Sequence, residues 1–131
     1  MNADIDICSE TRVIGQVEAI ITSPGYPNTK YPSRQNCVKV IRFQKRIPFR
    51  IQFIGDFELE KDPYRDQYLD IIAIRNCENE NAQLIMEKCD NRKPEAVNLI
   101  GSSVWIKFVS DGYTQKKGFS VRVIQLAYSK G

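Results

Sequence analysis

The chain has 131 residues, of which 42% are hydrophobic, enough for one globular domain with its own core. Its net charge of +3 is far below that of most dedicated nucleic-acid-binding proteins, so nucleic acid is not an expected partner. No hydrophobic run reaches the length of a membrane span, so we expect no membrane insertion by this segment.

The first part of the chain begins with an acidic stretch, residues 1–6, that lacks the hydrophobic core of a signal peptide. The chain is therefore either a mature segment behind an added Met1 or a protein that never was secreted. A run rich in Val and Ile, residues 16–22, predicts the first strand. Turn signals follow at residues 23–28 and 31–33, where Pro and Gly are frequent.

The middle of the chain continues with strand patterns. We expect strands at residues 37–43, 49–53, 68–74, 84–86 and 97–99, with turns at 54–56, 61–63 and 101–103. Residues 49–53 alternate strictly between hydrophobic and polar, which is typical of a strand with one buried face. Residues 82–88 also fit a helical turn.

The last part of the chain predicts strands at residues 104–109 and 119–126, separated by a polar loop that opens with Ser110 and Asp111. We expect the aromatic residues Trp105, Phe108, Phe53 and Phe43 to lie in the core. Many short strands with turns between them indicate an all-β fold, either a sandwich or a barrel.

The four cysteines indicate two disulfides rather than a zinc site. They lie at positions 8, 37, 77 and 89, without the short spacings of zinc ligands, and the chain has no histidine. Four cysteines allow three pairings, among which spacing does not choose. Disulfides favour an oxidising, extracellular compartment.

Catalytic motifs are missing from the sequence. Without histidine, a serine or cysteine nucleophile lacks its usual base. There is no G-x-S-x-G elbow, no P-loop and no G-x-G-x-x-G motif. Carboxylates are plentiful, but nothing selects a pair for glycoside hydrolysis. We therefore expect a protein that is not an enzyme.

Several segments together resemble the CUB domain family. They are GQVEAIITSPGYPNTKYP (15–32), IGDFELE (54–60), YLDIIAI (68–74) and FVSDGYTQKKGFSVRV (108–123). The resemblance implies a two-sheet antiparallel β-sandwich, similar to a jelly roll, over residues 8–126. Residues 1–7 and 127–131 would then be tails.

The resemblance also implies a disulfide pairing. Cys8 and Cys37 match the first disulfide of the family. The third cysteine of the family usually precedes the Tyr-Asp strand, whereas here Cys77 follows it, which indicates a shifted second disulfide, Cys77–Cys89. The family usually has Trp two residues after its second cysteine, where this chain has Lys39.

Many CUB domains bind one Ca²⁺, and the resemblance implies a site for it here. Matched by motif, the acidic ligands are Glu60, Asp70 and Asp111, supported by Tyr31. Calcium prefers six to eight oxygen ligands, and carboxylates that converge without a cation would repel one another. Oxygens of the following residues would complete the shell: Gly112, Tyr113 and Thr114. Asp66 could replace Asp70 because the loop before Asp70 is long, Glu58 lies on the same face as Glu60 by alternation, and Asp111 could instead be a turn residue.

The expected function is that of a non-catalytic extracellular module, secreted or part of a larger ectodomain. Calcium-ordered loops would bind a Lys or Arg of a protein partner. The alternative is a module that binds heparin-like glycans through the basic residues Lys45, Arg46, Arg50, Lys116 and Lys117, provided that they share a face. A purely structural spacer is a third possibility.

Overall fold

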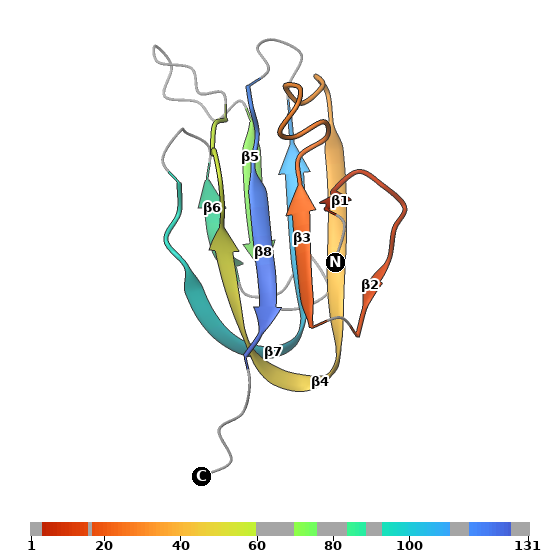
Figure 1. Cartoon of the computed structure of the whole chain (residues 1–131), viewed down its shortest axis with the longest axis vertical. Coiled ribbons are helices and arrows are strands. Elements are labelled where there is room, and N and C mark those ends of the chain that lie inside the picture. Colours follow the sequence, from red (N-terminus) through yellow and green to blue (C-terminus); the bar gives the residue numbers. More distant parts are fainter. Residues whose placement is uncertain are drawn as a thin grey trace.

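The computed structural model describes residues 4–15, 17–59, 70–75, 84–88, 93–110 and 116–126, and only the backbone of residues 84–88. These residues form an all-β fold (Figure 1). Its strands are β1 (Ile5–Asp6), β2 (Val13–Ile14), β3 (Glu18–Thr22), β4 (Asn36–Phe53), β5 (Ile71–Arg75), β6 (Leu84–Lys88), β7 (Val97–Val109) and β8 (Ser120–Gln125). In the described ranges no helix has the length and hydropathy that a membrane crossing requires.

Hydrogen bonds join the strands in the order β1-β3-β8-β4-β7-β5-β6, and β2 pairs separately with β4. The two longest strands, β4 with 18 residues and β7 with 13, form the antiparallel ladder at the centre of this order. Their register shifts between Arg42 and Ile47. At that point both strands curve together, at the lower end of Figure 1. The ladder therefore continues from one side of the molecule to the other.

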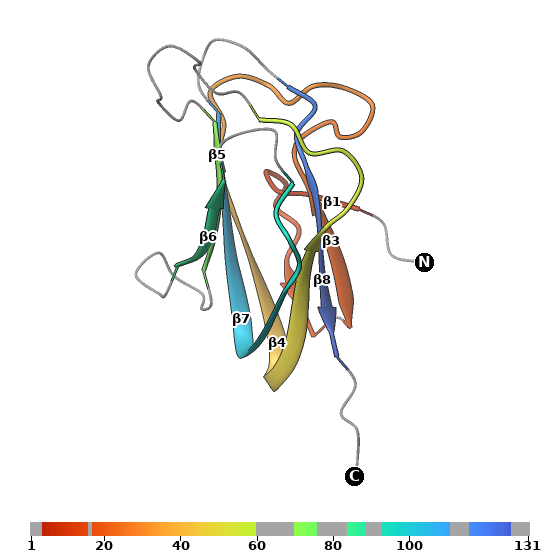
Figure 2. The same ribbon diagram turned by 90° about the vertical axis from the view of Figure 1, so that its left-hand side faces the viewer.

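The strands attached to this ladder lie on two sides of the molecule (Figure 2). Layer A contains β2, β5, β6, residues 36–42 of β4 and residues 103–109 of β7. Layer B contains β1, β3, β8, residues 47–53 of β4 and residues 97–101 of β7. Alternate side chains of both layers form one hydrophobic core, including Ile41, Ile72, Ile106 and Phe108 of layer A and Phe49, Ile51, Val121 and Val123 of layer B. Each such side chain contributes about 1.5–3 kcal/mol when fully buried.

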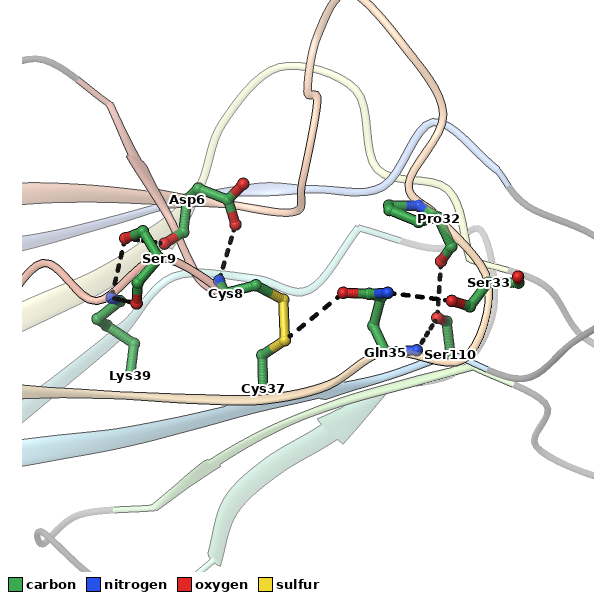
Figure 3. Close-up of a disulfide and its surroundings, with 9 residues drawn as sticks. All are labelled: Asp6, Cys8, Ser9, Pro32, Ser33, Gln35, Cys37, Lys39 and Ser110. Atoms are coloured by element: carbon green, nitrogen blue, oxygen red, sulfur yellow. Dashed lines mark hydrogen bonds between the residues drawn. A yellow bond between two sulfur atoms is a disulfide. The ribbon is translucent and has the colours of Figure 1, made fainter.

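The N-terminal segment closes one edge between the layers. β1 pairs with β3 in layer B, and β2 pairs with β4 in layer A, so residues 7–12 cross from one to the other. The Cys8–Cys37 disulfide fixes this crossing, with a Cα–Cα distance of 5.0 Å (Figure 3). Within the expected tail, residues 1–7, Ile5–Asp6 thus form strand β1 and the side chain of Ile7 is fully buried.

The long ladder changes two sequence-based expectations. The turn expected at residues 101–103 does not form, because β7 runs without a break through Gly101 opposite Ile47. Likewise, the strands expected at 37–43 and 49–53 are one strand, β4. Polar residues at a bend shared by two paired strands resemble a turn in the sequence. Residues 84–88 form a strand, so the alternative of a helical turn there is wrong.

Candidate functional site

A buried polar pair lies at the end of the molecule where β5 begins. Asp70 directly precedes β5 and is fully buried, and Tyr31, in the segment between β3 and β4, is 1% exposed. The Tyr31 hydroxyl donates a hydrogen bond to Asp70 Oδ2. The Tyr31 ring packs edge-on against Phe108, with 5.0 Å between ring centroids. Burial of a charged carboxylate costs free energy. The hydrogen bond from the Tyr31 hydroxyl offsets part of this cost and favours the charged form of Asp70.

The backbone of Tyr31 is bound to the segment that leads into β8. The amide of Tyr31 donates to the carbonyl of Lys116, at 3.1 Å. Gly118 follows with φ = +94°, a conformation that L-residues rarely adopt. A Cβ at Gly118 would overlap Ser23 Oγ and would lie 3.2 Å from Tyr31 Cδ2. Glycine therefore allows the segment before β8 to pack closely against the tyrosine.

The end of β7 is fixed beside the same tyrosine. Ser110 Oγ donates to the carbonyl of Pro32 at 2.8 Å and accepts from the amide of Gln35 at 2.9 Å (Figure 3). The amide of Ser110 donates to the carbonyl of Gln35 at 2.9 Å. Ser110 is 4% exposed. The residue before Asp111 is thus held firmly next to Pro32, which follows Tyr31 in the chain.

The segment that precedes Glu60 reaches the same region. Glu58 and Gly118 form an antiparallel bridge through two backbone hydrogen bonds of 2.8 and 2.9 Å. The carboxylate of Glu58 accepts from the amide of Lys117 at 3.2 Å. Leu59 is 1% exposed and belongs to the core. Glu58 thus faces Lys117, so its own carboxylate already has a structural role.

The structure describes two of the residues expected at the calcium site, Asp70 and Tyr31, and brings them into direct contact. The other expected residues lie outside the described residues: Glu60, Asp111, Gly112, Tyr113 and Thr114, as does the alternative ligand Asp66. Within the ranges described, no three acidic or cysteine side chains form a metal-binding group. The donor chemistry of Asp70 fits a hard cation, because its carboxylate oxygens are buried and oriented by the Tyr31 hydroxyl.

An exposed ion pair lies beside this region. Lys117 Nζ is 3.1 Å from Asp56 Oδ2, and both side chains are more than half exposed. The hydrogen bond to Asp56 raises the pKa of Lys117 above its ordinary value. The Tyr26 hydroxyl accepts from the amide of Asp56 at 2.9 Å, which orders this turn. Pairs of this exposure contribute little to stability.

The basic residues considered for glycan binding do not share one face. Lys45 and Arg46 are exposed at the β4 bend, at the lower end of Figure 1. Arg50 lies in layer B, where its Nε donates to Asn98 Oδ1 at 2.8 Å. Lys116 and Lys117 lie a few residues before β8, whose start is at the upper end of the figure. The five residues therefore form separate clusters.

The expected disulfide Cys8–Cys37 is confirmed. Cys77 and Cys89 lie outside the described residues. Next to the disulfide, Lys39 is 4% exposed and donates to Ser9 O at 2.7 Å, Ser9 Oγ at 3.1 Å and Thr11 O at 2.8 Å (Figure 3). Burial lowers the pKa of Lys39, and the nearby Asp6 acts in the opposite direction. Sequence reasoning missed this role, although Lys39 stands out as a lysine between two valines of a strand and in place of the usual Trp of the family.

Comparisons with known proteins agree with this architecture. The CUB domain family model matches residues 8–123. Rat neuropilin-2 is 41% identical over 103 residues, which is 78% of this chain and 11% of that protein. Human tolloid-like protein 1 is 31% identical over 100 residues, 76% of this chain and 10% of that protein. The chain thus spans about a tenth of the length of these relatives.

Solved structures give the same result. The MASP-1 CUB2 domain bound to Ca²⁺ matches with a TM-score of 0.77 and 26% identity, over 89% of this chain and 99% of that one. The CUB1-EGF-CUB2 domain of human MASP-1/3 matches with the same TM-score and identity, over 91% of this chain and 42% of that one. CUB domains are non-catalytic interaction modules of extracellular proteins. On the family match, the relatives and these structures, the chain belongs to the CUB domain family.

Proposed function

We propose that this CUB domain binds one Ca²⁺ through Glu60, Asp70 and Asp111 and uses the ordered loops to bind a basic residue of a partner protein. The observation that carries the proposal is the buried hydrogen bond between Tyr31 and Asp70. The likeness to the MASP-1 CUB2 domain bound to Ca²⁺ supports it.

Chain connectivity supports the assignment of the two other acids. Asp111 directly follows Ser110, which is bound to Pro32, and Glu60 follows Leu59, whose neighbour Glu58 is bridged to Gly118. Both acids therefore start from anchors next to the Tyr31 region. Three carboxylates there would favour a divalent cation, because it offsets their mutual repulsion.

In this proposal Tyr31 is a positioning residue. Its hydroxyl orients the carboxylate of Asp70, so that the ion meets an arranged ligand. Oxygens of Gly112, Tyr113 and Thr114 would complete the ligand shell. When bound, the ion would supply positive charge that orders the acidic segments.

The partner contact follows from the same charge arrangement. Carboxylates at a calcium site retain negative charge toward solvent, which attracts a lysine or arginine of another protein. Two unit charges at about 4 Å interact by roughly 4 kcal/mol at an effective dielectric constant near 20, before desolvation is subtracted. A contact of this kind is weakened by salt, so several copies would add strength through avidity.

Two further expectations belong to the proposal. A second disulfide, Cys77–Cys89, would restrain the region between β5 and β7 within a two-sheet, jelly-roll-like sandwich. The domain would comprise residues 8–126, together with the preceding residues 5–7 that pack onto it. Glycan binding through all five basic residues has no support from their positions in separate clusters.

Calorimetric titration of the purified protein with CaCl₂ tests the proposal directly. We expect heat from a single site and a rise in melting temperature that grows with calcium concentration, since the ion binds only the native state. MgCl₂ should have a much smaller effect, because Mg²⁺ demands tighter octahedral geometry. If calcium produced neither heat nor a shift, the proposal would be wrong.

A further inference from the structure

The first part of β7, residues 97–101, is an edge strand of layer B. It pairs with residues 47–51 of β4. β5 pairs only with the later part of β7, residues 105–109. The first part of β7 lies at the left-hand side of the molecule in Figure 1. Among the described residues, therefore, no strand pairs with the other side of residues 97–101.

The hydrogen-bond pattern indicates which backbone groups point to this open side. In an antiparallel ladder, successive residues of a strand bond alternately to one neighbouring strand and to the other. The carbonyl of Pro48 accepts from the amide of Leu126 at 3.0 Å, so Pro48 bonds toward β8. Ile100 is opposite Pro48 in the β4–β7 ladder, and its N–H and C=O groups consequently point away from β4. Asn98, two residues earlier, points the same way.

The open edge of β7 lacks the usual protection of sheet edges, which consists of charged residues, proline, bulges or very short strands. Its residues are in unbroken register with β4 and are all uncharged: Val97, Asn98, Leu99, Ile100 and Gly101. The other described edges differ. β3 begins with Glu18 and pairs with β1, β6 ends with Glu87 and Lys88, and β1 and β2 have two residues each. The edge of β7 is thus open and uncharged at once.

The side chains beside the open edge are mainly hydrophobic. An open hollow on layer B is lined by Pro48, Asn98, Leu99, Ile100 and Leu126. Ile100 is 53% exposed, and Leu99 is partly buried and packs against the core. The polar side chain of Asn98 is already bound, since its Oδ1 accepts from Arg50 Nε at 2.8 Å. A strand added here would meet backbone groups and aliphatic side chains rather than charge.

We propose that this edge pairs with the same edge of a second copy of the chain, antiparallel about a two-fold axis at Leu99. In this register Asn98 of each copy is opposite Ile100 of the other. These are the residues whose backbone groups point to the open side, so each such pair exchanges both of its hydrogen bonds. The two copies of layer B then form one continuous sheet.

Register and closure favour a second copy as the occupant. The two Leu99 side chains meet at the axis in a pair without hydrogen bonds, where side chains lie closest, and the two Ile100 side chains become diagonal neighbours. Each copy offers one edge of this kind among its described strands, so pairing ends at two copies and does not continue into a fibre. A charged strand of another protein would find no ion-pair partner in the uncharged residues 97–101.

Sedimentation equilibrium of the full chain measures the pairing. A pair of five-residue strands is a small interface, so we expect a monomer–dimer equilibrium with a dissociation constant on the order of 0.1–1 mM. The result should be the same in CaCl₂ and in EDTA, because the contact uses none of the residues proposed to bind calcium. A monomer at every concentration up to about 1 mM would overturn the proposal.

Matched lysine variants locate the contact. Ile100→Lys introduces a charge at the open edge and should raise the dissociation constant at least about tenfold. Val17→Lys makes the same change at a residue that is 66% exposed, before β3, and should leave the constant unchanged. Thermal melts check that both variants fold. Equal weakening by both variants would overturn the proposal.

Proline variants test the direction of the backbone groups. Ile100→Pro removes an N–H that points to the open side, so the monomer should stay folded while the dimer is lost. Leu99→Pro removes an N–H that bonds toward β4, so its melting temperature should fall much further. Equal melting temperatures of the two variants would contradict the assigned pattern and, with it, the proposed pairing.

A cysteine variant tests the position of the axis. Under mild oxidation, Leu99→Cys should form a covalent dimer faster than Val17→Cys, although Val17 is the more exposed residue, and the wild type controls for the native cysteines. Slower linkage of Leu99→Cys would overturn the register. A synthetic peptide of residues 95–103 is the last probe. If it bound the edge while the protein itself stayed monomeric, the occupant would be a strand of another protein and the second copy would be wrong.

Discussion

The two buried ionisable residues Lys39 and Asp70 have different roles in this domain. Lys39 is 4% exposed, and its ammonium group binds oxygens of Ser9 and Thr11 in the crossing segment. Asp70 is fully buried and accepts a hydrogen bond from the hydroxyl of Tyr31. The positive group thus closes an edge with neighbours from its own chain, whereas the negative group lies where a cation is proposed to bind. Burial of charge alone therefore does not identify a site; the partners do.

The first way to test this comparison is to remove the disulfide beside Lys39. Cys8→Ala with Cys37→Ala opens a link between positions 29 residues apart in sequence. In the chain-entropy account this costs about 3–4 kcal/mol of unfolding free energy. Urea unfolding of the double variant and the wild type measures the difference.

The same disulfide variant also tests the region of Tyr31 and Asp70. If the edge and the loop end are independent, the disulfide variant should retain its calcium-induced shift in melting temperature wherever it remains folded. If the variant lost both its stability and the calcium-induced shift, the edge at Lys39 and the end at Asp70 would form one unit and would not be independent.

The sequence predicted the fold class and the disulfide at the edge near Lys39, but it did not predict the long strands or the role of Lys39. Alternation gave the all-β class, and the family resemblance gave Cys8–Cys37. The continuous β4 and β7 strands were missed, because polar residues 44–46 and Gly101–Ser103 look like turns when the partner strand is unknown. The role of Lys39 was missed for a similar reason, since its acceptors lie about 30 residues earlier in the chain.

At the loop end, the sequence motif predicted Tyr31 as the support of the acids, and the structure places it against Asp70. Periodicity could not have paired them, because 39 residues separate the two. Glu60 and Asp111 remain assignments by motif, strengthened by the anchors at Glu58 and Ser110. The contact of Glu58 with Lys117 depends on the position of the segment before β8, which no local sequence pattern predicts.

The second prediction concerns calcium itself. Asp70→Asn keeps the size of the side chain but removes its charge, so we expect calcium affinity to fall at least a hundredfold. Asp111→Ala and Glu60→Ala should act in the same way, because each removes about a third of the negative charge. Wild-type protein at about 100 times the dissociation constant should gain roughly 2.7 kcal/mol, and these variants should gain almost nothing.

Two controls sharpen this measurement. Asp66→Ala should leave the calcium shift nearly unchanged, and a large loss would make Asp66 the ligand in place of Asp70. Tyr31→Phe removes only the hydroxyl, so affinity should fall less than in Asp70→Asn. An unchanged affinity in Tyr31→Phe would mean that the hydrogen bond has a purely structural role.

The third prediction tests the positive member of the pair. Lys39→Met keeps the hydrophobic part of the side chain but leaves the Ser9 and Thr11 carbonyls without their donor. We expect a loss of about 1–3 kcal/mol of unfolding free energy, and no effect on calcium affinity. A gain in stability would show that the burial cost of the ammonium group exceeds the value of its three hydrogen bonds.

The pH dependence of Lys39 has a definite sign. Burial lowers its pKa in the folded protein below the ordinary 10.5, so between these two values the unfolded chain binds more protons. The unfolding free energy of the wild type should therefore rise with pH in that window relative to Lys39→Met. Urea titrations at several alkaline pH values test this, and a falling difference would contradict the assigned cause.

The smallest expected effect belongs to the exposed pair of Lys117 and Asp56. Lys117→Gln removes an ion pair of 3.1 Å whose members are 59% and 67% exposed. Because solvent and salt screen such pairs, its melting temperature should agree with that of the wild type within error. The raised pKa of Lys117 means that the small stabilisation is complete below pH 10.5 and disappears as pH rises through the higher folded value. A clear loss of stability at neutral pH would instead show that Lys117 secures the segment before β8, where its backbone amide meets Glu58 and the neighbouring carbonyl of Lys116 meets Tyr31.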